Sequence, residues 1–186
     1  MAVQDSTHWR TVNDYAAFCR KPENADRRFE LINGEIIEKV PTEEHGIIAI
    51  RIAGEIYIYL KLHPIARAGV EVNHQMPNDP YNSRLPDISV TLITDAPVVK
   101  HGAVPHMPDL AVEIKSPDQT LKGQREKAAY YLEHGCRLVW LIYPHKRIVE
   151  IYTADDIQIM TEEDTLDGGD VLPEFTLKIS DIFAAL

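Results

Sequence analysis

Cysteines and long apolar runs are both scarce in this sequence. Cys19 and Cys136 are its only cysteines and form no CxxC pair, so we expect reduced, packed thiols rather than disulfides. No stretch approaches the ~20 apolar residues that span a bilayer. Residues 1–10 are polar and lack the cationic start and apolar stretch of a secretory signal. We therefore predict a cytoplasmic protein without a membrane partner.

Positive charge is scarce as well. The 19 Lys and Arg residues stand against 29 Asp and Glu residues, which gives a formal net charge of −10. Because Lys and Arg drive phosphate binding, any nucleic-acid role must be local, supplied by bound divalent cations or a small basic patch. An acidic surface kept for solubility explains the charge equally well. The sequence also has no GxSxG, P-loop or dinucleotide-binding motif, which weakens the serine-hydrolase, NTPase and dehydrogenase interpretations.

The length and the remaining composition are those of an ordinary globular domain. The chain has 186 residues, of which 45% are hydrophobic, and this is enough for one domain with a sizeable core. We predict a single domain over residues 1–186. It would comprise an N-terminal helical extension at 1–28, a core at 29–179 and a short C-terminal helix at 180–186.

Hydrophobic periodicity and turn residues predict the order of the elements. Helical spacing is found at residues 11–20, 42–62 and 119–135, and Asn33-Gly34 is typical of a tight hairpin turn. Strands are predicted at residues 66–72, 87–93, 109–115 and 137–143, followed by short strands up to residue 179. This order predicts a mixed α/β (α+β) fold, in which a central mixed β-sheet is flanked by two main helices and extended by extra strands on the C-terminal side.

Two acidic residues are predicted to face each other across this sheet. The strands that begin at Asp87 and end at Lys115 are joined by a loop rich in proline and glycine, so the simplest pairing is an antiparallel hairpin. If the loop is centred near Lys100, Asp87 lies opposite Glu113. Because side chains alternate along a strand, Glu113 and Lys115 share one face. Two acids and a lysine are therefore expected to converge, although a surface ion pair on an edge strand would look the same.

A pair of neighbouring carboxylates is most simply stabilised by a metal ion. Two such groups repel each other unless a cation neutralises them, and hard oxygen ligands suit Mg²⁺ or Mn²⁺. Asp87 and Glu113 would be ligands, and the backbone carbonyl of Ile114 could add another oxygen. The ion could lower the pKa of an attacking water, which Lys115 could orient. The residues thus predict a site for phosphodiester chemistry.

The same residues resemble a known nuclease signature. Leu85-Pro86-Asp87, followed by Val112-Glu113-Ile114-Lys115, resembles the PD-(D/E)XK pattern of restriction-endonuclease-like nucleases. The chain more closely resembles a family of uncharacterised restriction-endonuclease-like proteins that is abundant in cyanobacteria. The segments that carry this resemblance, within roughly residues 29–179, are 29–35 (FELINGE), 44–46 (EHG), 86–87 (PD), 108–113 (PDLAVE), 116–117 (SP), 127–135 (KAAYYLEHG) and 139–142 (VWLI).

The resemblance implies a restriction endonuclease-like core and a metal-dependent endonuclease that hydrolyses DNA. Asp87 and Glu113 would be metal ligands and Lys115 the catalytic lysine. Glu30 would be an additional acid near the metal, and His45 a member of the outer ring of the site. From the residues alone, Glu30 could equally pair with a neighbouring arginine, and His45 could be a packed histidine of the first helical turn.

The identity of the catalytic lysine stays open at this point. Many relatives carry an apolar residue at the position of Lys115, and the lysine of the following helix, here Lys127, would then take over its role. Lys127 and the site candidate Gln124 could also belong to a solvated helix face. DNA is the expected substrate, and a homodimer is expected by analogy with nucleases that cut both strands. The alternative function is a nucleic-acid- or protein-binding module that keeps the nuclease fold without hydrolysis.

Overall fold

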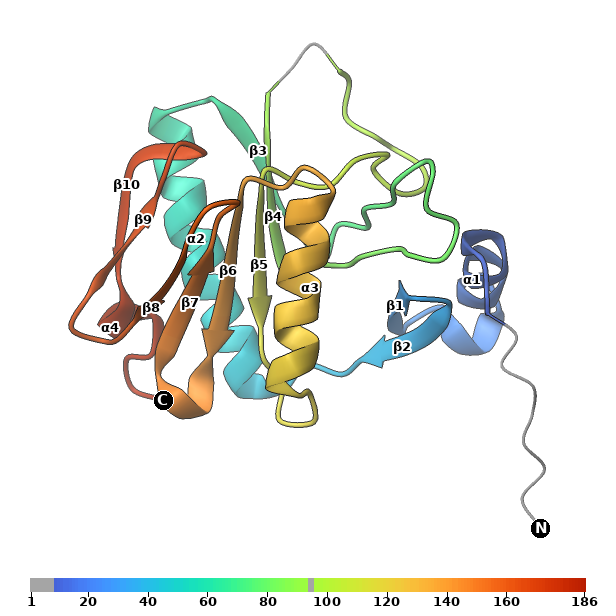
Figure 1. The fold of residues 1–186 in the computed structure, drawn as a ribbon, viewed down its shortest axis with the longest axis horizontal. Coiled ribbons are helices and arrows are strands. Elements are labelled where there is room, and N and C mark those ends of the chain that lie inside the picture. Colours follow the sequence, from blue (N-terminus) through green and yellow to red (C-terminus); the bar gives the residue numbers. More distant parts are fainter. Residues whose placement is uncertain (1–8, 94–95) are drawn as a thin grey trace.

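The centre of the molecule is one six-stranded mixed sheet. A computed structural model of the protein describes residues 9–93 and 96–186, so the first eight residues of the predicted N-terminal extension lie outside the described residues. The sheet has the strand order β3-β4-β5-β6-β7-β8 (Figure 1). Its strands are β3 (Ala66–Val70), β4 (Ile88–Leu92), β5 (Leu110–Ile114), β6 (Leu138–Tyr143), β7 (Ile148–Tyr152) and β8 (Ile157–Met160).

The pairing of these strands follows from the connections between them. β4 and β5 are antiparallel, as expected for strands joined by a loop, whereas β5 and β6 are parallel and joined through helix α3 (Leu121–Glu133). A parallel pair needs such a crossover, because its two strands run in the same direction. The predicted mixed sheet and its helical crossover are confirmed.

Two helices cover the two faces of the sheet, as the sequence predicted. Helix α2 (Glu43–Leu62), capped by Thr42, buries Ile48, Ile52 and Ile56 against one face. Helix α3, capped by Thr120, packs Ala128 and Tyr131 against the other. Figure 1 shows the two helices on opposite sides of the strands. Since residues alternate along β5, Leu110, Val112 and Ile114 enter the α2 face while Ala111 and Glu113 face α3.

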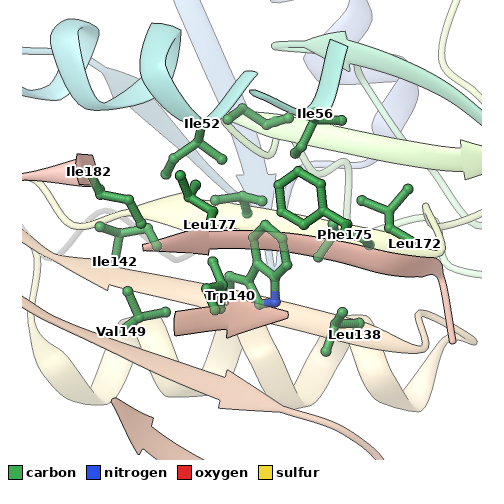
Figure 2. Close-up of a cluster of buried hydrophobic side chains, with 14 of the residues drawn as sticks. Ile52, Ile56, Leu138, Trp140, Ile142, Val149, Leu172, Phe175, Leu177 and Ile182 are labelled. Carbon is green, nitrogen blue, oxygen red and sulfur yellow. The ribbon is translucent and has the colours of Figure 1, made fainter. Parts of the chain in front are cut away.

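The C-terminal strands add a layer on the α2 side. The hairpin of β9 (Thr165–Gly168) and β10 (Leu172–Lys178) precedes the short helix α4 (Ile179–Ile182). Phe175 of β10 stacks on Trp140 with ring centroids 6.0 Å apart, within the apolar cluster of Figure 2. The C-terminal helix is shorter than predicted and begins one residue earlier. This layer seals the core beside α2, away from Glu113.

The N-terminal segment forms a separate two-stranded sheet beside α3. Strands β1 (Arg28–Ile32) and β2 (Glu35–Lys39) are joined by Asn33 and Gly34, whose φ angles of 48° and 78° are those of the expected tight turn. Helix α1 (Val12–Cys19) packs on β1, where the Tyr15 hydroxyl donates to the Phe29 carbonyl at 2.7 Å. Two short 3-10 helices complete the elements, η1 (Pro22–Asn24) and η2 (Pro144–Lys146). Among the described residues, no helix is long and apolar enough to cross a membrane.

Candidate functional site

The two predicted acids meet where β4 begins and β5 ends. Ile88 pairs with Val112 in the antiparallel register, and continuing that register by one residue places Asp87 opposite Glu113. This is the pairing that a loop centred near Lys100 predicts. Asp87 Oδ2 accepts a hydrogen bond of 2.7 Å from the backbone N–H of Ile114, which fixes the carboxylate at the end of the strand. Both acidic side chains are buried.

A third acid and a lysine join this pair from other elements. Glu30 of β1 accepts from the Leu85 backbone N–H at 2.9 Å through Oε1, and its Oε2 lies 2.7 Å from Nζ of Lys127. The same ammonium donates to Glu113 Oε2 at 3.0 Å. Tyr131, one helical turn after Lys127, donates its hydroxyl to Glu113 Oε1 at 2.8 Å. Helix α3 thus supplies both side chains that donate hydrogen bonds to Glu113.

A second lysine, which the sequence did not predict, enters from β2. Lys39 Nζ donates to Asp87 Oδ1 at 2.6 Å and to the Leu85 carbonyl at 2.7 Å, and it lies 4.0 Å from Glu113 Oε2. His45, in the first turn of α2, places Nε2 3.2 Å from the same Asp87 oxygen. We call the five charged residues that meet here the acid–lysine cluster; they are Glu30, Lys39, Asp87, Glu113 and Lys127.

The three carboxylates of the acid–lysine cluster have the same pattern of contacts. One oxygen of each is held by a backbone N–H or by the Tyr131 hydroxyl, while the other faces an ammonium group. Three carboxylates therefore meet two ammonium groups, which leaves one negative charge in excess. Buried charges are tolerated only when paired and hydrogen-bonded in this way.

Burial and mutual attraction set the protonation of the cluster. Burial raises the pKa of Asp87, but the charge of Lys39 and the hydrogen bond from His45 outweigh it and hold this pKa below its usual range. Burial alone would lower the pKa of Lys39 and of Lys127, yet the neighbouring carboxylates raise both, so each is a firm ammonium. Burial raises the pKa of Glu113, which makes it the acid that protonates most readily among these groups.

The oxygen atoms of Asp87 and Glu113 are suitable ligands for a hard divalent cation, but the Lys39 ammonium lies between them. Asp87 Oδ1 and Glu113 Oε2 both face Lys39, and carboxylate oxygens are the ligands that Mg²⁺ and Mn²⁺ prefer. Within residues 9–93 and 96–186, no three His, Cys, Asp or Glu side chains form a ready-made metal group. Instead, the Lys39 ammonium lies between Asp87 and Glu113, and the Lys127 ammonium lies between Glu30 and Glu113. The proposed role of the Ile114 carbonyl stays a prediction.

Lys115 lies apart from the acids that it was expected to join. Its Nζ donates to the Ser116 carbonyl at 3.0 Å, and the side chain lines a different pocket beside Tyr143. β5 ends at Ile114, so strand alternation does not fix the direction of the next side chain. The expected convergence of Lys115 with Asp87 and Glu113 is therefore wrong in this structure, and its catalytic role stays a prediction.

A cleft of about 550 Å³ runs between α3 and the β1–β2 hairpin and reaches the acid–lysine cluster. Its lining includes Glu30, Lys127, Gln124 and Arg84. Gln124 donates to Gln119 Oε1 at 2.8 Å, but its own buried Oε1 has no partner in the described part of the chain. The cleft therefore offers polar groups next to the acids.

Arg84 is an unusual residue of this cleft. It is only 3% exposed, and its Nε and Nη1 have no hydrogen-bond partner among the described residues. Its guanidinium lies over the ring of Tyr130, with Cζ 4.0 Å from the ring centroid, which holds the cation by attraction to the π face. Arg84 thus carries spare donors beside the cleft.

The sequence reasoning missed Lys39, Tyr131 and Arg84. The hairpin offered a signal for the first, since Arg28 pairs with Lys39 and Glu30 with Ile37. Paired residues share a face, so Lys39 lies on the face of Glu30. Tyr131 stands four residues after Lys127, on the same side of a helix. Arg84, three residues before Asp87, had no distinguishing pattern.

Comparison with known proteins relates the fold of this chain to that of a nuclease family. A family model described as "Uma2: Putative restriction endonuclease" matches residues 12–180. The chain is similar to the crystal structure of "a putative nuclease belonging to DUF820" from Anabaena variabilis ATCC 29413, with a TM-score of 0.78 and 27% identity over 93% of this chain and 97% of that one. No curated protein matches the chain. The predicted restriction endonuclease-like fold is confirmed.

Proposed function

We propose that this chain, which belongs to the Uma2 family of restriction-endonuclease-like proteins, is a metal-dependent endonuclease that hydrolyses DNA. The descriptions of the family and of the similar crystal structure both name a nuclease, which supports this function. One observation carries this proposal. Asp87 and Glu113 each have one oxygen fixed by a hydrogen bond and the other turned toward a cation, beside Lys127. Such preorganised oxygens at a cleft suit phosphodiester hydrolysis.

Each residue of the site has a distinct task in the proposed reaction. Asp87 and Glu113 would hold a Mg²⁺ or Mn²⁺ ion, with Glu30 nearby. When bound, the ion supplies a lowered pKa for an attacking water and neutralises charge on the phosphate. Lys127, whose pKa is raised by Glu113 and Glu30 against the effect of burial, acts as an ammonium that stabilises developing negative charge and not as a base.

The cleft between α3 and the β1–β2 hairpin is the proposed place of the DNA backbone. Arg84 and Lys127 supply positive charge there, but Glu30, Glu126 and Glu133 line the same cleft. The bound divalent ion would therefore supply the rest of the local positive field that a protein with a net charge of −10 needs. In the reaction, the water oxygen bonds to phosphorus, the bond from phosphorus to the leaving sugar oxygen breaks, and that oxygen gains the proton that the water loses. Gln124, on the same wall, would hold the strand in place.

Cleavage assays on purified protein test this function. Supercoiled, linear and single-stranded DNA would be incubated with Mg²⁺, Mn²⁺ or a chelator. We expect metal-dependent cutting that falls by about 100-fold or more in Asp87→Asn and Glu113→Gln, because metal ligands are lost. Glu163→Gln, at an exposed position away from the site, is the matched control. Cutting that persists in chelator or in both variants would overturn the proposal.

The same assay decides between the two candidate lysines. Lys127→Met should lower cutting about 100-fold, since Lys127 contacts Glu113, whereas Lys115→Met should change it less than about threefold. Circular dichroism would show that both variants are folded. The reverse order of effects would return the catalytic role to Lys115.

The alternative, a binding module without hydrolysis, rests on one specific observation. Lys39 and Lys127 already neutralise most of the carboxylate charge without any metal. If calorimetry finds no Mn²⁺ binding and no DNA is cut while DNA or a protein partner is still bound, this function replaces the enzymatic one.

A further inference from the structure

Lys39 occupies the place where a cation would be held. Its ammonium contacts Asp87 Oδ1 at 2.6 Å and the Leu85 carbonyl at 2.7 Å, with Glu113 Oε2 at 4.0 Å. Two carboxylates and a backbone carbonyl are the oxygen donors that hard divalent ions select. The side chain is only 8% exposed, so this contact is an interior feature and not a chance pairing at the surface.

We propose that Lys39 is the resident cation of the acid–lysine cluster, and that a divalent ion binds Asp87 and Glu113 only when the Lys39 ammonium moves out. The inference rests on the proposed function, because it concerns the same metal ligands. It assigns to Lys39 control of metal affinity. Lys127 has a different place, since it bridges Glu30 and Glu113 and makes no contact of 4.0 Å or less with Asp87 among the described ion pairs.

The charges of the cluster favour exchange of the two cations over simple addition. With both lysines in place, three carboxylates leave one negative charge in excess. Adding a divalent ion to that set would create an excess positive charge in a buried site. Replacing the single charge of Lys39 by a double charge brings the cluster to neutrality instead. Buried sites strongly prefer such a balance.

A neighbouring cleft offers the displaced ammonium a place to go. It has a volume of about 110 Å³, and Lys39, Asp87 and His45 line it together with three further acids, Glu38, Glu71 and Asp118. Glu38 and Glu71 pair with Arg27 and Arg28 at the rim, whereas Asp118 has no ion pair in the described part of the chain. Lys39 is the last residue of β2, so its side chain can turn toward Asp118 without breaking the hairpin.

Metal binding to a Lys39→Met variant tests the proposal. Methionine has a similar length and no charge, so the oxygens of Asp87 and Glu113 are left for the ion. Calorimetric titration with MnCl₂ alone should give a dissociation constant at least about tenfold lower than in the unaltered protein, in which the ion must displace an ammonium. Lys61→Met, at an exposed position of α2, should leave the constant unchanged. Equal or weaker binding in Lys39→Met overturns the proposal.

A measurement on the unaltered protein covers the case in which the variant does not fold. Amine labelling by reductive methylation, read by mass spectrometry, should modify Lys39 slowly without metal and at least about fivefold faster with saturating MnCl₂. Lys127, which stays buried between its two acids, is the internal control. A Lys39 labelling rate that is unchanged or slower with metal contradicts the exchange.

The outcomes separate this inference from the proposed function. If the protein cuts DNA with Mn²⁺ but Lys39→Met binds the ion no more tightly and labelling does not rise, the inference fails and the function stands. If neither protein binds Mn²⁺, both fail. Tighter binding by Lys39→Met without cleavage of any DNA supports the inference while removing the enzymatic function.

Discussion

At the residue scale, the buried polar side chains differ in whether their partners are complete. The acids of the acid–lysine cluster are fully partnered, whereas His74 keeps one ring nitrogen without a partner in the described part of the chain. His74 Nδ1 lies 2.8 Å from the His106 carbonyl, to which a protonated Nδ1 donates. The neutral ring then has a bare, buried Nε2, where a proton would place an uncompensated charge.

This arrangement predicts a loss of stability in acid. Burial lowers the pKa of His74 to about 4, against about 6.5 in the unfolded chain. Between these values the unfolded state binds more protons, so the free energy of unfolding falls as pH falls from 6.5 to 4, by up to roughly 3 kcal/mol from this residue.

Urea unfolding of the unaltered protein and of His74→Asn at several pH values would measure the effect. As the pH falls from 6.5 to 4, the free energy of unfolding should fall more for the unaltered protein than for His74→Asn. The reason is that only the unaltered protein carries a histidine whose pKa is lowered by burial. A difference that stays constant from pH 7 to pH 4 would show that His74 is not held neutral.

At the element scale, the position of α3 matters most, because it carries Lys127 and Tyr131. A buried acid of β7 fastens this helix to the sheet. Glu150 accepts hydrogen bonds from the hydroxyls of Tyr143 and Tyr152 at 3.0 and 2.8 Å, and from Arg125 of α3 at 2.6 Å. The contact therefore ties the helix to the strand next to β6.

Removing this acid should loosen α3. Glu150→Leu leaves two buried hydroxyls and a guanidinium without their acceptor, which should cost about 3 kcal/mol in the free energy of unfolding. Arg125→Met should cost less than about 1 kcal/mol, since the Arg125 side chain is 52% exposed. Chemical denaturation measures both changes in the free energy of unfolding. Equal changes would show that Glu150 holds α3 through its ion pair with Arg125 alone.

At the scale of the whole molecule, the few cations near the cleft must act against an acidic protein. With a net charge of −10, contacts to DNA phosphates are expected to come from a small set, Arg84 and Lys127 in the cleft and Lys115 in the separate pocket beside Tyr143. Each contact to duplex DNA contributes about 0.9 to the salt slope of the binding constant. The predicted homodimer would double the number of sites, and light scattering would test it.

The salt dependence of DNA binding should consequently be shallow. For one site, we expect the logarithm of the binding constant to fall with the logarithm of salt concentration with a slope of about 3 or less in magnitude. Fluorescence anisotropy with Asp87→Asn, in which we expect cutting to be suppressed, would measure it. A slope near 6 per site would reveal a broad basic surface elsewhere on the protein.

Much of the fold was predictable because its signals are local. Asn33-Gly34 specified the hairpin, helical periodicity located α2 and α3, and the loop centred near Lys100 set the register that pairs Asp87 with Glu113. Such features depend on neighbours in the chain and on the strict alternation of strands. The sequence by itself therefore determined the sheet, its two covering helices and the carboxylate pair.

Only the tertiary structure decided which lysines meet those acids. Lys39 and Lys127 reach Asp87 and Glu113 from β2 and α3, whereas Lys115, the nearest in sequence, turns to Ser116. A lysine side chain is long and flexible, so its direction follows from whichever acceptors the packed elements bring within reach. No periodicity along the chain encodes that choice, because the partners come together only when the hairpin and α3 close over the end of the sheet.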